Sequence, residues 1–97
     1  MFARIITGKM KIECIDEAVA IYNDSVVPAA RKQNGFKNAH LFTDPKTGRY
    51  RSITIWETEE DMIAGDISGY LKKQLDKLTV HFAERPIIEH FVYSAQG

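Results

Sequence analysis

Apolar residues recur at different spacings along the 97-residue chain, and these spacings predict where strands and helices lie. Residues 2–12 carry apolar side chains at both even-numbered and odd-numbered positions, which is typical of a strand buried on both faces. Between Ile15 and Val26 they recur every three or four residues, which predicts an amphipathic helix capped by Asp16. Pro28 must break or kink this helix, and we expect Gly35 to end it.

A hairpin is predicted next, with strands over residues 36–43 and 49–57. Pro45 presets its turn, and Gly48 supplies a positive φ before the chain returns. Thr58 is expected to cap a second helix, which Gly69 is expected to bend. A last strand should then follow over residues 87–93, again apolar on both parities.

The order of these elements is βαββαβ, which predicts an α+β ferredoxin-like fold in a single domain over residues 1–97. In this fold a four-stranded antiparallel sheet carries two helices on one face. The strands have apolar side chains on both faces, so the face without helices should be buried by another molecule. An identical sheet is the simplest cover, and we therefore expect a homodimer.

Composition and charge narrow the classes of partner. The chain has 13 basic and 13 acidic residues, so its net charge is zero, which argues against nucleic acid and against an anionic membrane surface. No apolar run is long enough to span a membrane. The single Cys14 and the lack of an apolar leader favour a reducing compartment, and we expect a cytoplasmic protein.

Two short motifs resemble those of the antibiotic biosynthesis monooxygenase-like family. "QNGF" follows the helix that Pro28 interrupts, and "IWETEEDM" is similar to the family's W-x-S/T-x-E/D signature at a strand end. The resemblance extends from Ile5 to about Tyr93. It implies a dimeric α/β barrel, in which two sheets face each other and each subunit has a small pocket between its helices and its sheet.

The resemblance also implies which reactions to expect. Haem-degrading members use an Asn on strand one, the strand-three Trp and a His ten positions beyond it, but here only Trp56 matches, and Asp66 stands where the His is needed. Oxygenases of aromatic polyketides have an Asn four positions before the Trp, where this chain has Ser52. The match is therefore to the scaffold, and it implies oxidation of a small aromatic or quinol by O₂ without any cofactor.

Three aromatic residues are candidates for contact with a small apolar or aromatic ligand. Trp56 could wall an apolar pocket and donate its indole N–H, while Tyr22 and Tyr93 could reach a pocket with their hydroxyls. Each is also explained as an ordinary core residue. A dimer that binds a ligand or a partner without catalysis is therefore the alternative to an oxygenase.

His40 is the candidate catalytic base, because imidazole titrates near neutral pH. A five-residue turn, 44–48, would place His40 on the same sheet face as Trp56, whereas a four-residue turn, 45–48, would turn it toward the dimer barrel beside Ile53. Glycine in the last loop position favours the four-residue turn. The other histidines have no evident partner ligands in the sequence, so we expect no metal site.

Overall fold

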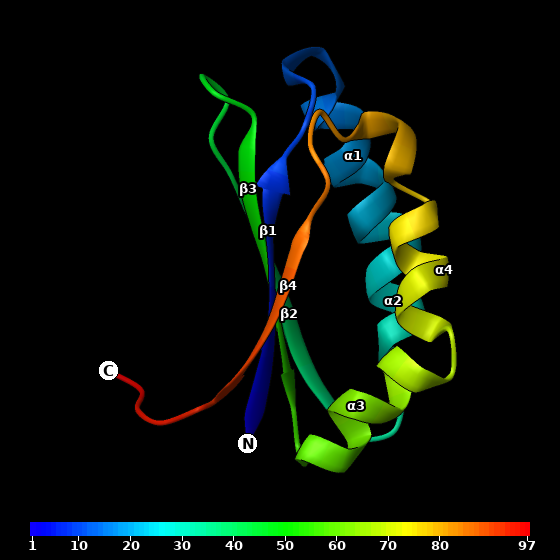
Figure 1. Ribbon diagram of the computed structural model, residues 1–97, viewed down its shortest axis with the longest axis vertical. Helices are drawn as coiled ribbons and strands as arrows, with labels where there is room; N and C mark the ends of the chain where they lie inside the picture. Colours follow the sequence, from blue (N-terminus) through cyan, green and yellow to red (C-terminus); the bar gives the residue numbers. More distant parts are fainter.

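The computed structural model describes all residues, 1–97, and has two layers, a sheet and a set of helices (Figure 1). Four antiparallel strands lie side by side in the order β2-β3-β1-β4. Their bounds are Phe2–Lys9 for β1, Phe36–Thr43 for β2, Arg49–Trp56 for β3 and Ile87–Val92 for β4. This is the strand arrangement of a ferredoxin-like fold, and the predicted fold class is confirmed.

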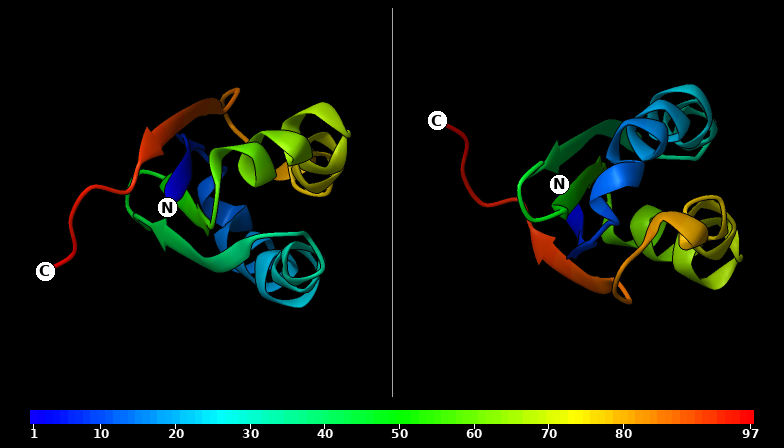
Figure 2. Two further views of the ribbon diagram at one scale, coloured as in Figure 1. Left: turned by 90° about the horizontal axis from the view of Figure 1, so that it is seen from below. Right: turned by 90° about the horizontal axis from the view of Figure 1, so that it is seen from above.

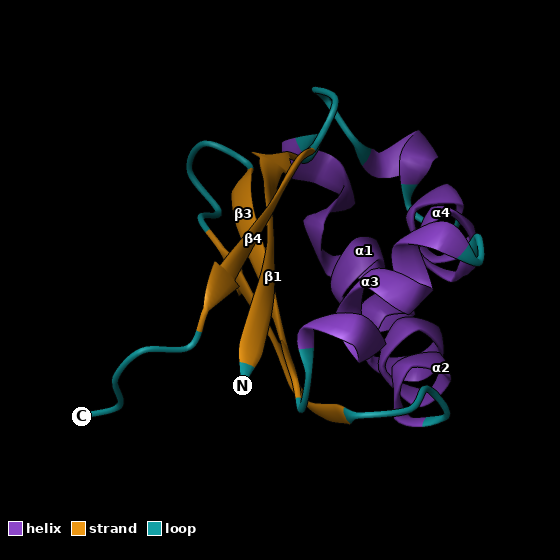
Figure 3. Ribbon diagram, turned by 60° about the horizontal axis from the view of Figure 1, so that its bottom comes forward, coloured by secondary structure: helices purple, strands orange, loops and turns teal.

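All of the helices pack on one face of the sheet, as the end-on views in Figure 2 and the coloured layers in Figure 3 show. They are α1 (Ile15–Ile21), α2 (Val27–Arg31), α3 (Glu59–Ile67) and α4 (Tyr70–Asp76), with short helical turns η1 (Ile12–Cys14), η2 (Tyr22–Val26) and η3 (Thr79–His81). No helix combines the length and the apolar character that crossing a membrane requires.

The first strand is shorter than predicted. It ends at Lys9, and the expected extension to Ile12 is wrong. Met10 forms only an isolated bridge with Phe82, and the next residues turn into η1. The apolar residues beyond Lys9 therefore serve the junction with the helices and not a longer sheet.

The first helix begins without the predicted cap. Cys14 occupies the N-cap position and makes no side-chain cap hydrogen bond, so the assignment of Asp16 as the cap is wrong. The predicted effect of Pro28 is confirmed, because α1 passes through the π-helical turn η2 before α2, which has Pro28 in its first turn. A proline has no N–H to donate to the carbonyl four residues earlier, and a π turn accommodates that loss.

The hairpin has the register of the four-residue turn. Thr43 pairs with Tyr50 and His40 with Ile53, and the Asp44 N–H donates to the Arg49 carbonyl at 2.8 Å. The shorter of the two turns considered is therefore confirmed. Gly48 has a φ of +82°, as the turn requires.

The second helical segment matches its sequence signals. Thr58 precedes α3, and its hydroxyl accepts a hydrogen bond from the Asp61 N–H at 3.1 Å, so the predicted cap is confirmed. The predicted bend lies at Gly69, which has a φ of +85° and separates α3 from α4. The helical layer therefore consists of two pairs of short helices.

Two glycines with positive φ differ in the space around them, and this difference predicts different tolerance to alanine. A Cβ at Gly48 would collide with the Met10 carbonyl oxygen, whereas a Cβ at Gly69 would meet nothing within 4 Å. We expect Gly69→Ala to lower the free energy of unfolding by about 1–2 kcal/mol, from backbone strain alone. Gly48→Ala should lower it further, because the backbone must also shift, and equal losses in urea unfolding would contradict this account.

The strand register sorts the sheet side chains onto two faces. The face under the helices carries Arg4, Ile6, Leu41, Tyr50, Ser52, Thr54 and His90. We call the other face the open face, and it carries Ala3, Ile5, Thr7, His40, Phe42, Arg51, Ile53, Ile55, Ile87, Glu89 and Phe91. The open face is largely apolar and has no helix over it (Figure 1).

Candidate functional site

A cavity of about 50 Å³ lies between the sheet and the helices. Strands β1, β2 and β3 form its floor, and α2, η2 and α4 supply most of its walls. Fourteen of its 18 lining residues are hydrophobic, so its walls suit the apolar body of a ligand. The four polar exceptions are Arg4, Ser52, Thr54 and Gln74.

Two hydroxyl groups from residues that line this cavity contact each other. The Tyr22 hydroxyl lies 2.9 Å from Ser52 Oγ, and a longer contact of 3.5 Å joins it to the His40 carbonyl oxygen. Both side chains are buried, with Tyr22 6% exposed and Ser52 9% exposed. Burial raises the pKa of Tyr22, and the hydrogen bond with Ser52 offsets part of that rise.

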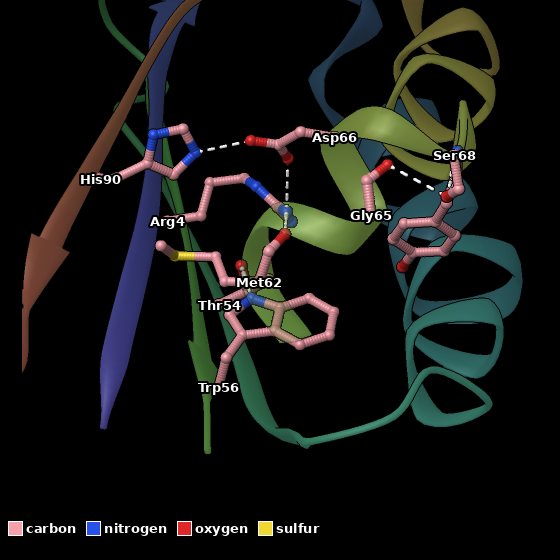
Figure 4. A network of polar contacts seen from close by, with 9 residues as sticks. Arg4, Thr54, Trp56, Met62, Gly65, Asp66, Ser68 and His90 are labelled. Atoms are coloured by element: carbon pink, nitrogen blue, oxygen red, sulfur yellow. Dashed lines mark hydrogen bonds and ion pairs between the residues drawn. The ribbon is translucent and has the colours of Figure 1, made fainter. Parts of the chain in front are cut away.

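A charged network borders the cavity at Arg4, whose side chain is only 2% exposed (Figure 4). Arg4 Nη2 donates to the Met62 carbonyl oxygen and to Asp66 Oδ1, both at 2.6 Å. His90 Nε2 lies 2.8 Å from the other carboxylate oxygen, Asp66 Oδ2. Strands β1 and β4 and helix α3 thus contribute one charged or titratable side chain each.

Trp56 lies directly beside this network and not in the cavity wall. Its ring is fully buried, and the Arg4 guanidinium carbon lies 5.2 Å from the ring centroid. The indole N–H donates to Thr54 Oγ1 at 3.0 Å, and the Phe36 ring packs edge-on at 5.6 Å. Trp56 therefore contacts two residues that line the cavity, Arg4 and Thr54, without lining the cavity itself.

The other predicted site residues are scattered. His40 projects from the open face, where its ring stacks on Phe42 at 6.3 Å, and only its backbone carbonyl reaches toward Tyr22. Tyr93 follows the end of β4, where its N–H donates to the Met1 carbonyl at 2.9 Å, and it does not line the cavity. Of the four predicted residues, only Tyr22 lines the cavity.

The titratable side chains that line the cavity are Arg4 and three tyrosines. Desolvation raises the pKa of all three phenols, and for Tyr50 it raises the pKa to about 12. A phenol with a raised pKa stays protonated at neutral pH and acts as a hydrogen-bond donor. The cavity can therefore donate to a ligand oxygen more readily than it can remove a proton.

No cluster of three or more histidine, cysteine or acidic side chains is positioned to hold a metal ion. His90 and Asp66 contact each other, but their nearest charged neighbour is the cation Arg4. The chemistry available at the cavity is therefore that of apolar contact, hydroxyl donors and one guanidinium.

Reasoning from the sequence missed Arg4 and its pairing with Asp66 and His90. The sequence contains one signal for it. Arg4, Ile6 and Met10 are all at even positions, so on a strand their side chains lie on the same face, the one that the helices cover. A charge at such a position is expected to have a partner. The partners lie 62 and 86 residues further along the chain, beyond the reach of local patterns.

Comparison with known proteins gives relatives of unknown activity. No family model matches the sequence. The uncharacterized proteins Rv2557 and MT2634, from two Mycobacterium tuberculosis strains, are each 36% identical to the chain over 95 residues. The match covers 98% of this chain and 42% of each relative, so the chain spans about two fifths of their length.

Several solved structures have a similar fold. A crystal structure of an antibiotic biosynthesis monooxygenase superposes with a TM-score of 0.75, at 18% identity, over 98% of this chain and 100% of that one. Rv0793 from Mycobacterium tuberculosis gives 0.74 at 9% identity, over 98% and 96% of the two chains. The monooxygenase from the gene ActVA-Orf6 of Streptomyces coelicolor, solved in complex with Nanaomycin D, gives 0.73 at 17% identity, over 98% and 88%.

At identities this low, the structural similarity establishes the fold but not the activity. The strand order, the helices on one face and the superpositions agree with one another. The chain therefore has the antibiotic biosynthesis monooxygenase-like fold, in agreement with the resemblance of its motifs.

Proposed function

We propose that the protein is a homodimeric α/β-barrel protein that takes a small aromatic or quinol molecule into the cavity between its sheet and its helices. The observation that carries this proposal is the composition of the cavity wall, which is mostly apolar but brings together the Tyr22 and Ser52 hydroxyls and the Arg4 guanidinium. Apolar walls with a few convergent polar groups are typical of sites for small organic ligands.

We further propose that the bound molecule is oxidised by O₂ without a metal or organic cofactor. For a quinol, one oxygen atom of O₂ is inserted into a ring C–H bond and the other leaves as water, so that the product is a hydroxyquinone. The substrate supplies all four electrons, two from the hydroxylated carbon and two from the oxidation of quinol to quinone. The protein has to orient the substrate and stabilise the anion that reacts with oxygen. Arg4 and the tyrosine hydroxyls are the groups suited to that task.

The size of the cavity restricts the ligand. An engineered protein cavity of about 150 Å³ binds benzene, and the present cavity has about 50 Å³. A ring can therefore enter only if helices or side chains move apart. The helical layer has joints for such a movement, at Gly69 between α3 and α4 and at the π turn η2.

Binding without catalysis is the second candidate function, and a specific observation favours it. No side chain that lines the cavity is a base at neutral pH, because its titratable groups are one arginine and tyrosines whose pKa values are raised. The candidate base His40 lies on the open face. It could act only on a ligand held between two facing sheets.

Oxygen consumption with a series of single-ring quinols separates these functions. If the cavity is the reaction site, the wild-type protein consumes O₂, Tyr22→Phe and Trp56→Phe are slower, and His40→Ala keeps its rate. If His40→Ala no longer consumes O₂ while Tyr22→Phe consumes it at the wild-type rate, the reaction takes place at the dimer interface and not in the cavity. Saturable quenching of the single tryptophan, Trp56, with no oxygen consumed would support the binding function.

A further inference from the structure

The cavity contains polar atoms that find no partner within the protein. Three buried side-chain polar atoms have no hydrogen-bond partner: Arg4 Nε, Tyr50 Oη and His81 Nδ1. The first two belong to residues that line the cavity. Buried polar groups in folded proteins are almost always paired, so an unpaired donor in a cavity wall indicates the place of a ligand atom or a water molecule.

Arg4 is the stronger of the two donors because it is charged. Both of its hydrogen bonds come from Nη2, to Met62 and Asp66, so the Nε–H remains free. Tyr70, whose pKa is raised chiefly by desolvation, lies close enough for the Arg4 charge to lower that pKa in part. Arg4 therefore presents a positive charge to a poorly solvated, mostly apolar space.

The charges around Arg4 limit how much negative charge a ligand can bring. Asp66 balances Arg4, and His90 contacts the outer oxygen of Asp66. Both hydrogen bonds of Arg4 are made by Nη2, so its Nε–H is a buried donor that remains available for a single ligand oxygen. A dianion would leave an unbalanced charge in a buried site, and that is strongly unfavourable.

We infer that the cavity selects ligands with one acidic oxygen, and that it holds this oxygen as the anion against the free donor of Arg4. The inference rests on the proposed function in one respect, that the ligand occupies this cavity. The apolar body of the ligand then lies along Ile6 and Leu75, and the hydrogen-bonded Tyr22–Ser52 pair belongs to the same cavity wall. The acidic group is a phenolate or a carboxylate, since both offer the same charged acceptor.

A chromophoric ligand series tests this inference on the wild-type protein. 4-Nitrophenol ionises to a yellow phenolate, 4-nitroanisole has nearly the same shape but cannot ionise, and 4-nitrobenzoate carries a carboxylate. We expect the pKa of bound 4-nitrophenol to fall by about one to two units, because a charge-assisted hydrogen bond favours the anion. It should bind on the order of ten- to a hundredfold tighter than 4-nitroanisole.

Variants assign the effect to Arg4. Arg4→Met should abolish the preference for the anion, Arg4→Lys should keep part of it, and Arg85→Met, which removes an exposed arginine outside the cavity, should leave it unchanged. If Arg4→Met does not fold, the wild-type series and Arg4→Lys still decide the question. Tighter binding of 4-nitrobenzoate than of 4-nitrophenol would assign the site to carboxylates.

The possible failures of this test are distinguishable. If 4-nitroanisole and 4-nitrophenol bind equally and the phenol stays protonated, the cavity binds aromatic molecules but does not select anions, and the inference is overturned. If no member of the series binds to the wild-type protein, the proposed ligand cavity is overturned together with it.

Discussion

Replacing Arg4 with methionine is expected to lower the free energy of unfolding by about 3 kcal/mol, the lower end of the range for breaking a buried ion pair. The substitution leaves the Met62 carbonyl and the Asp66 carboxylate without their donor. Because Asp66 keeps 24% of its side chain exposed, water compensates for part of the loss. Urea unfolding followed by the fluorescence of Trp56 measures the effect.

The matched control is Lys72→Met, which removes the cation of an exposed ion pair. Lys72 Nζ lies 2.9 Å from Asp76 Oδ2, but the two side chains are 80% and 59% exposed. We expect a loss of less than about 0.5 kcal/mol, as for other exposed pairs one helical turn apart. The double variant Arg4→Met with Asp66→Leu should be more stable than Arg4→Met alone. Equal losses in Arg4→Met and Lys72→Met would mean that the buried network does not stabilise the fold.

Replacing Ile53 with glutamate is expected to dissociate the proposed homodimer. Ile53 lies in the middle of the open face, between Ile5 on β1 and His40 on β2. On the same face Phe42, Ile87 and Phe91 are 58%, 62% and 47% exposed, so a second sheet would cover a broad apolar surface. A carboxylate buried in that interface without a partner would weaken the association by at least about a hundredfold.

The control for this variant is the same substitution at Ile67. Ile67 lies at the end of α3, is 81% exposed and is not part of the open face, so Ile67→Glu should leave the association unchanged. Sedimentation of the wild-type protein and the two variants at micromolar concentration measures the difference. A wild-type protein that sediments as a folded monomer of 11.0 kDa would refute the dimer.

Much of the fold follows from local signals in the sequence. Gly48 in the last loop position favoured the four-residue turn, which determines the face on which the side chains of residues 38–43 lie. Thr58 and Gly69 marked a helix start and a bend, because a capping hydroxyl and a left-handed glycine act over only a few residues. The predicted start of the first helix was wrong because the helical turn η1 comes directly before α1. The helix α1 therefore begins at Ile15, and Asp16 lies inside it and not at its N-cap.

The site was less predictable because its parts come from distant segments. The parity of Arg4 was visible in the sequence, but its partners depend on β4 lying beside β1 and on α3 lying above it. Trp56, the only tryptophan, was predicted to contact a ligand, but its indole N–H donates to the Thr54 hydroxyl, two residues away on the same strand. An aromatic residue at a strand end does not indicate whether it lines a cavity or supports the residues that do.

Ligand contacts in β1 test the central claim, that the space between the sheet and the helices is the binding site. Ile6 lines the cavity, whereas its neighbour Ile5 lies on the open face, so the two δ1 methyl groups report on opposite sides of one strand. With 4-nitrophenol bound, NMR of protein with labelled isoleucine methyls should show ligand NOEs to Ile6 and none to Ile5 or Ile53. NOEs to Ile5 and Ile53 without one to Ile6 would contradict the account and place the ligand between two facing sheets.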